Sequence, residues 1–192
     1  MRTVKEPDVR RQEILDGAIR VFARNGYDKT TISSIAKELN ISQGLCYRYF
    51  PSKEDIYRAA IEKYADMIVE TYLSHRKETW SVRDWMDSIA VSIGRMNEAE
   101  SRDEGLYALF HGENSEAMHS ELILKVASKM LPYIQNIVRN ARETGEISVD
   151  DPEKAAIIGL YGELGVFQMK GLTDEERVGI IRLGWERLLG LK

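Results

Sequence analysis

Apolar residues recur at three- and four-residue intervals along most of the chain, a pattern that predicts α-helices. The first such segment, about residues 8–25, places Ile14, Ala18 and Phe22 on one face. A longer one, about residues 53–75, has acidic residues in its first turn, where a helix dipole favours them. Further segments follow up to the C-terminus, so we expect an all-α fold of about nine helices.

Residues 30–50, between these two segments, fit two short helices joined by a tight turn. Thr30 or Thr31 is placed to cap the first helix, whose apolar positions would form one buried face. Asn40 tolerates the left-handed conformation that a tight turn needs, and Ser42 is placed to cap the second helix. This shape fits the major groove of DNA.

The second short helix would present Gln43, Leu45, Tyr47 and Arg48 outward. Glutamine pairs with adenine through two hydrogen bonds, an apolar side chain meets the thymine methyl, and arginine and tyrosine reach phosphates. Gly44 lets the backbone come close to the groove. The alternative is a buried helical hairpin whose polar residues only face water.

These residues give the chain a resemblance to the TetR family of bacterial transcriptional repressors. The match begins on the first helix, continues through the hairpin and ends in the helix that follows it. It rests on Ile14, Ala18, Phe22, Asn25-Gly26-Tyr27, Thr31-Ile32, Ile35-Ala36, Ile41-Ser42-Gln43-Gly44, Tyr47-Arg48-Tyr49-Phe50-Pro51-Ser52-Lys53-Glu54 and, as its last residue, Tyr57.

The resemblance implies an N-terminal three-helix helix-turn-helix domain in residues 1–52 and a C-terminal helical ligand-binding and dimerisation domain in residues 53–192. It also implies a homodimer that binds a DNA operator and responds to a small-molecule inducer. Cys46 departs from the family pattern, because a larger aliphatic residue usually faces the domain core there. Carried over by position, the family's DNA contacts fall on Thr31, Ser33, Ser42, Gln43, Leu45, Tyr47, Tyr49 and Lys53.

The charge distribution agrees with a DNA-binding N-terminus. The net charge is −4, yet residues 1–60 carry eleven basic and eight acidic side chains, against sixteen and twenty-three in the rest. Attraction to phosphate would therefore be local to the motif.

Two apolar helices are expected near the C-terminus. Asp151-Pro152 opens one that would end at Gly171, and Thr173 with Glu176 forms a capping box for the other. The resemblance places the dimer interface here, as a four-helix bundle made from two such pairs. The alternative is a hairpin buried within one subunit. The candidate interface residues are Ile158, Gly162, Gly165, Ile181, Trp185 and Leu188.

An effector pocket in a helical domain would be lined by apolar and aromatic side chains with a few polar anchors. Most aromatic residues at helical spacing simply fill a core. The helices in question diverge within the family, so the sequence does not identify the inducer. The candidate lining residues are Trp85, Met86, Tyr107, Phe110, His111, Tyr133, Tyr161 and Phe167.

Other chemistry has little support. The spacing of His111, Glu113 and His119 does not put three ligands on one helical face, so we expect no metal and no cofactor. Cys46 is expected to be a buried structural thiol rather than a redox sensor. No catalytic constellation was found, so an enzyme is not expected.

The chain has no run of 18 apolar residues and no signal-like N-terminus, which favours a cytoplasmic protein without a membrane partner. The leading hypothesis is a ligand-responsive regulator, a repressor that binds a palindromic operator as a dimer and leaves it when an inducer binds. The alternative is a module that binds a small molecule or a protein and has no specific operator.

Overall fold

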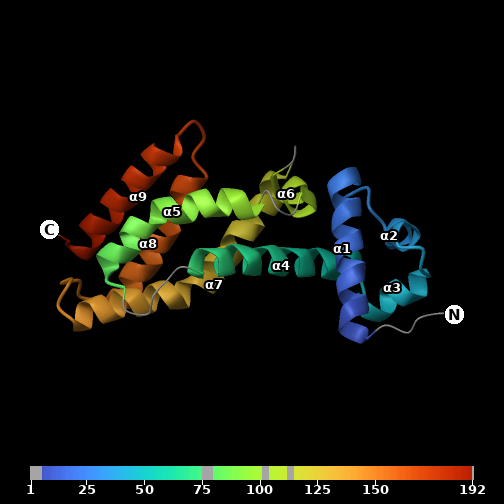
Figure 1. Ribbon diagram of the computed structural model, residues 1–192, viewed down its shortest axis with the longest axis horizontal. Coiled ribbons are helices and arrows are strands. Elements are labelled where there is room, and N and C mark those ends of the chain that lie inside the picture. The colour runs from blue at the N-terminus through green and yellow to red at the C-terminus, as the bar shows by residue number, and fades with distance from the viewer. Residues whose placement is uncertain (1–5, 75–79, 101–103, 112–114, 192) are drawn as a thin grey trace. The chain divides into compact units, whose positions relative to one another are not determined.

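The computed structural model describes residues 6–74, 80–100, 104–111 and 115–191, and the side chains of residues 92–100 and 116 are excluded. Within these ranges all regular secondary structure is α-helical, which confirms the all-α expectation (Figure 1). The described helices are α1 (Pro7–Asn25), α2 (Ile32–Glu38), α3 (Gln43–Tyr49), α4 (Lys53–Leu73), α5 (Val82–Glu100), α6 (Glu104–His111), α7 (Glu116–Glu143), α8 (Pro152–Phe167) and α9 (Asp174–Leu189).

The helices group into two compact units. Unit 1 comprises Met1–Tyr64 and Glu100–Leu122, and unit 2 comprises Ala65–Ala99 and Ile123–Lys192. Helix α6 belongs to unit 1 because it packs on α1. The compact units therefore do not coincide with the domains expected at residues 1–52 and 53–192. Those domains were defined by function, as DNA binding and effector binding, and this functional division stays a prediction.

Capping residues explain where several helices begin. The Ser81 and Asp84 side chains and backbone amides exchange hydrogen bonds at the start of α5. The Asp151 carboxylate accepts from the Lys154 amide ahead of α8. At α9, Thr173 and Glu176 form the expected capping box.

One expected helix end differs from the structure. Helix α8 ends at Phe167 rather than Gly171, which lies in the following loop with φ 83°. Helix α7 continues through Pro132, a residue type that often interrupts or kinks a helix. The expected end of the long helix at His75 lies outside the described residues, where α4 is followed only to Leu73.

The core of unit 1 contains Ile14, Ala18 and Phe22, all fully buried, which confirms the face expected for the first helix. Gly17 allows the Leu39 side chain to come close, because an added Cβ would lie 2.6 Å from Leu39 Cδ2. The first helix is thus the scaffold against which the two short helices pack.

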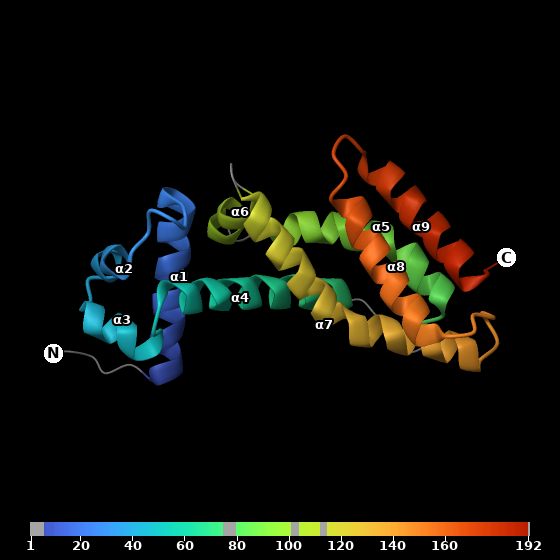
Figure 2. The ribbon, with the colours of Figure 1, turned by 180° about the vertical axis from the view of Figure 1, so that it is seen from behind.

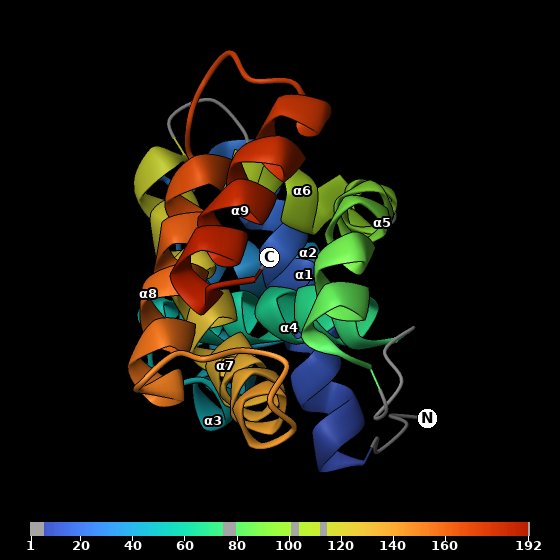
Figure 3. The ribbon, with the colours of Figure 1, turned by 90° about the vertical axis from the view of Figure 1, so that its left-hand side faces the viewer.

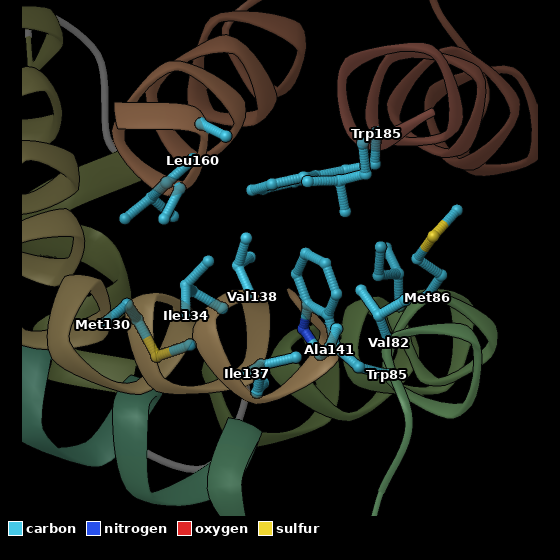
Figure 4. Packing of buried hydrophobic residues seen from close by; sticks show 14 of the residues in the cluster. Val82, Trp85, Met86, Met130, Ile134, Ile137, Val138, Ala141, Leu160 and Trp185 are labelled. Atoms are coloured by element: carbon cyan, nitrogen blue, oxygen red, sulfur yellow. The ribbon is translucent and has the colours of Figure 1, made fainter. Parts of the chain in front are cut away.

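The core of unit 2 lies among α5, α7, α8 and α9, with α8 and α9 side by side (Figures 2 and 3). Two buried tryptophans from different helices meet there, Trp85 and Trp185, edge to face at 4.7 Å between ring centroids (Figure 4). The Trp85 Nε1 also donates to the Tyr72 hydroxyl at 2.8 Å, which fixes the ring. Apolar side chains of α7 complete this core.

Candidate nucleic-acid interface

The two short helices of unit 1 begin at capped residues. The Thr31 hydroxyl accepts from the Ser34 amide at 3.1 Å, and the Ser34 hydroxyl oxygen accepts from the Thr31 amide at 3.0 Å. The Ser42 hydroxyl accepts from the Leu45 amide at 3.2 Å. Thr30 is buried and donates to the Gly26 carbonyl, so Thr31 is the cap of α2.

The turn between α2 and α3 has the expected conformation. Asn40 adopts φ 51°, and the Ile41 amide donates to the Ala36 carbonyl at 3.0 Å. Cys46 and Phe50 are buried on the inner face of α3, so the opposite face points outward. A helix-turn-helix unit with an accessible second helix results.

That outer face carries most of the expected DNA-reading side chains. Ser33, Gln43, Gly44 and Arg48 are exposed, and Tyr47 is 51% exposed. The Gln43 Nε2 donates to the Ser33 hydroxyl at 3.1 Å and thereby links α2 to α3. Thr31 and Ser42 are exposed as well, whereas Leu45 and Tyr49 are half-buried.

Lys53 has an internal role that the sequence did not indicate. Its ammonium donates to the Tyr27 carbonyl at 2.8 Å and lies 4.0 Å from the Tyr27 ring centroid. It therefore holds the turn after α1 to the start of α4. No periodicity or capping rule signals a contact between residues 26 positions apart. A phosphate contact by Lys53 stays a prediction.

Acidic groups near the interface are partly neutralised. The Glu38 carboxylate pairs with Arg24 at 2.8 Å and with Arg20 at 3.9 Å. The hydrogen bond from Arg24 lowers the pKa of Glu38 below its usual value. Lys29 and Lys37 are exposed and add positive charge to this unit.

Cys46 is fully buried, and this burial raises the pKa of its thiol. A thiol that resists ionisation is a poor nucleophile, in agreement with a structural role. The described residues contain no group of three or more side chains that could hold a metal ion. His111 and His119 do lie close, with ring centroids 4.9 Å apart, but Glu113 lies outside the described residues.

The candidate effector residues are divided between the two compact units. Tyr107, Phe110 and His111 belong to unit 1 and the other five to unit 2. Trp85, Met86 and Phe110 are buried as core residues, Tyr107, Tyr133 and Tyr161 are exposed, and His111 and Phe167 are intermediate. A cavity of about 370 Å³ lies in unit 1, and none of the candidates lines it. Its lining is Arg10, Glu13, Ile14, Asp16, Arg20, Leu39 and Ile41.

The candidate dimer residues divide into two groups. Ile158, Gly162 and Gly165 are exposed on α8, with Ile158 at 62%, and Leu188 on α9 is half-buried. Ile181 and Trp185 are buried in the core of their own subunit, so placing them on the dimer surface was wrong. They pack inward because α9 packs against α8 through this face. Four further apolar residues of these two helices, which were not among the interface candidates, are exposed as well: Ile157, Tyr161, Ile180 and Leu183.

None of the described helices combines the length and the hydropathy that a membrane span requires.

Several known proteins with similar sequences are named as regulators. The sequence profile described as "Bacterial regulatory proteins, tetR family" matches residues 14–60. The chain is 22% identical over 171 residues to the HTH-type transcriptional regulator SrpR of Pseudomonas putida, an alignment that covers 89% of this chain and 75% of SrpR. It is 32% identical over 72 residues to the biofilm operon icaADBC negative transcriptional regulator IcaR of Staphylococcus epidermidis, covering 38% and 39% of the two chains.

Among solved structures, that of Salmonella enterica GusR is similar over nearly its full length. The TM-score is 0.67 at 24% identity, and the superposition covers 97% of this chain and 98% of the other. This similarity supports the two-part helical fold.

Proposed function

We propose that this chain, a DNA-binding transcriptional regulator of the TetR family, binds a palindromic operator as a homodimer and releases it when a small molecule binds. The observation that carries the proposal is the exposed face of α3, where Gln43, Gly44, Tyr47 and Arg48 stand over a buried Cys46 and Phe50. Polar, aromatic and basic groups on one accessible helix fit a major groove. Regulators of this family are not enzymes, and a cytoplasmic location follows from the proposal.

The homodimer is supported by an apolar surface on α8 and α9, which we call the α8/α9 face: Ile157, Ile158, Tyr161, Ile180 and Leu183. Gly162 and Gly165 on α8 have open space where a Cβ would be, so a second backbone can approach closely there. A homodimer carries two copies of the helix-turn-helix segment, α2 and α3, which we call the reading unit. Two identical reading units require an operator with two-fold symmetry and half-sites spaced by whole turns of the duplex.

Release by an inducer requires that the inducer binds one conformer better than the other. Helix α4 begins beside the reading unit at Lys53 and contributes residues to both compact units. A shift of α4 would move Lys53 and the turn that it holds. Crystals with and without inducer that show the same tilt of α4 would contradict this mechanism. Repression rather than activation follows the family expectation.

The function is tested by selecting bound fragments from random duplex DNA with the purified protein at moderate salt. Recovery of a palindrome supports a dimeric operator-binding protein. Unselective binding that weakens steeply with salt favours the alternative, a binding module without a specific operator.

Replacing Tyr47 by alanine is expected to weaken operator binding about tenfold or more, because a contact on the reading face is lost without changing the fold. Fluorescence anisotropy with the selected operator measures the change. Tyr133→Ala serves as the control, since Tyr133 is similarly exposed at 42% but lies on α7. Lys53 is a poorer choice, because its loss would also free the turn after α1. If Tyr47→Ala and Tyr133→Ala bind the operator with equal affinity, the exposed face of α3 is not the surface that contacts DNA.

Ile158→Lys is expected to weaken dimerisation about 100-fold or more, because it places a charge on the α8/α9 face at its most exposed apolar residue, Ile158 at 62%. Sedimentation velocity measures the monomer–dimer equilibrium. Leu124→Lys is the control, with Leu124 56% exposed on α7 away from this face. A dimer that tolerates Ile158→Lys would place the interface elsewhere.

A further inference from the structure

Among the described side chains of unit 2, Glu163 on α8 is the ionisable one that is buried, with 8% of its surface exposed. The other buried polar side chains of the described residues are the hydroxyls of Thr30, Ser88 and Ser115. An ionised carboxylate is costly to place in an apolar core unless a cation accompanies it. A carboxyl group in this position therefore calls for a physical explanation.

The described residues offer Glu163 a single partner. Its Oε2 accepts from the Trp185 Nε1 at 3.1 Å, a neutral donor. Two basic side chains on the same helices pair with other acids: Arg182 with Asp87 and Lys154 with Asp151. Burial raises the pKa of Glu163 to about 7, against the smaller opposing effect of the indole N–H. Because Trp185 donates to Oε2, the other carboxyl oxygen, Oε1, keeps its capacity to accept hydrogen bonds.

The indole that meets this carboxyl group is held in place from two further sides. A Cβ at Gly159 would lie 2.2 Å from the Trp185 ring, so the backbone of α8 touches the ring face. The Trp85 ring meets it edge to face, and Trp85 in turn donates to Tyr72 (Figure 4). A carboxylate beside fixed indole rings is the combination that recognises organic cations, through a charge-assisted hydrogen bond and cation–π attraction.

We propose that Glu163, with Trp185 and Trp85, anchors an effector site in unit 2 whose ligand is an apolar organic amine bound as its ammonium ion. The inference rests on the proposed function only in assigning the effector to this unit. The ammonium would donate to the Glu163 oxygens, and its apolar part would replace contacts within the core. Because Trp185 packs against Glu163 in this structure, the amine binds a conformer in which this contact is opened. That opening alters the packing of α8 on α9, which together carry the α8/α9 face.

The test is direct binding to the full chain by isothermal titration calorimetry, without DNA. The probes are phenylalkylamines of increasing chain length, each compared with the alcohol of the same skeleton. Wild-type protein is expected to bind the best amine about tenfold tighter than its alcohol at pH 8. In Glu163→Gln this preference should fall below about threefold, because the amide keeps the shape and loses the charge. Glu175→Gln, at an exposed acid of α9, should behave as wild type.

A pH series on the wild-type protein gives a second measurement that needs no variant. The amines stay protonated between pH 5 and 8, so their preference over the alcohols should decline as the pH falls and Glu163 takes up a proton. The proposal is overturned if no amine binds better than its alcohol, or if the preference persists in Glu163→Gln or at pH 5. Failure to select an operator would instead refute the DNA-binding proposal and leave this result intact.

Discussion

Gly159→Ala is expected to destabilise unit 2 by about 3 kcal/mol or more, at the upper end of the range for overpacked cores. The added Cβ would lie 2.2–2.5 Å from three atoms of the Trp185 ring. In the closed packing that the structure shows, the ring is confined, because the Trp85 ring meets it edge to face at 4.7 Å and its Nε1 donates to Glu163. Urea denaturation followed by far-UV circular dichroism measures the loss.

Gly162→Ala is the matched control in the same helix. A Cβ at Gly162 meets nothing within 4 Å in its subunit, so alanine should raise subunit stability by up to about 1 kcal/mol through helix propensity. Because Gly162 lies on the α8/α9 face, sedimentation is measured alongside to separate subunit stability from dimerisation. Equal stability of the two variants would mean that α8 and α9 do not pack as closely as described.

The wild-type protein is expected to lose about 3 kcal/mol of stability as the pH rises from about 4.5 to 7, through Glu163 alone. The pKa of Glu163 is raised from 4.5 to about 7 by burial. In this window the folded chain keeps a proton that the unfolded chain has released. Unfolding therefore becomes more favourable with rising pH, and the contribution levels off above pH 7.

Glu163→Gln isolates this effect, because glutamine still accepts from Trp185 and does not titrate. Denaturant midpoints measured at pH 5 and pH 8 should shift in favour of the variant at the higher pH. Acids with a lowered pKa, among them Glu38, Asp151 and Glu176, titrate in both proteins and cancel in the difference. A difference between the two proteins that does not vary with pH would show that Glu163 is not buried in solution.

Local sequence signals predicted much of the fold. The caps at Thr31, Ser42 and Thr173 rest on interactions within three residues, so they are decided by the chain itself. The left-handed turn at Asn40 and the buried face of α1 follow from similarly short-range rules. The exposed face of α3 could be anticipated because its inner positions are apolar, whereas its role in reading DNA stays a prediction.

Contacts between distant residues were not predictable in this way. Periodicity showed that Trp185 lies on an apolar face of α9. Packing within the subunit and packing against a second subunit would both produce that pattern. Trp185 packs inward, and the exposed face is formed by Ile180 and Leu183 instead. The anchoring of Lys53 to the Tyr27 carbonyl depends on how α4 returns to α1, which no local rule contains.

The discontinuity of unit 1 matters for its synthesis. Its core joins residues up to Tyr64 with Glu100–Leu122, and Phe110 of α6 lies 5.3 Å from the Tyr64 ring, centroid to centroid. A ribosome has therefore released the whole helix-turn-helix segment well before α6, which packs on α1, has been made. At roughly 5–20 residues per second, several seconds separate the two events. During this interval the apolar surface of α1 that α6 later covers is exposed to solvent. A chaperone that binds exposed apolar segments could bind the nascent chain at this stage.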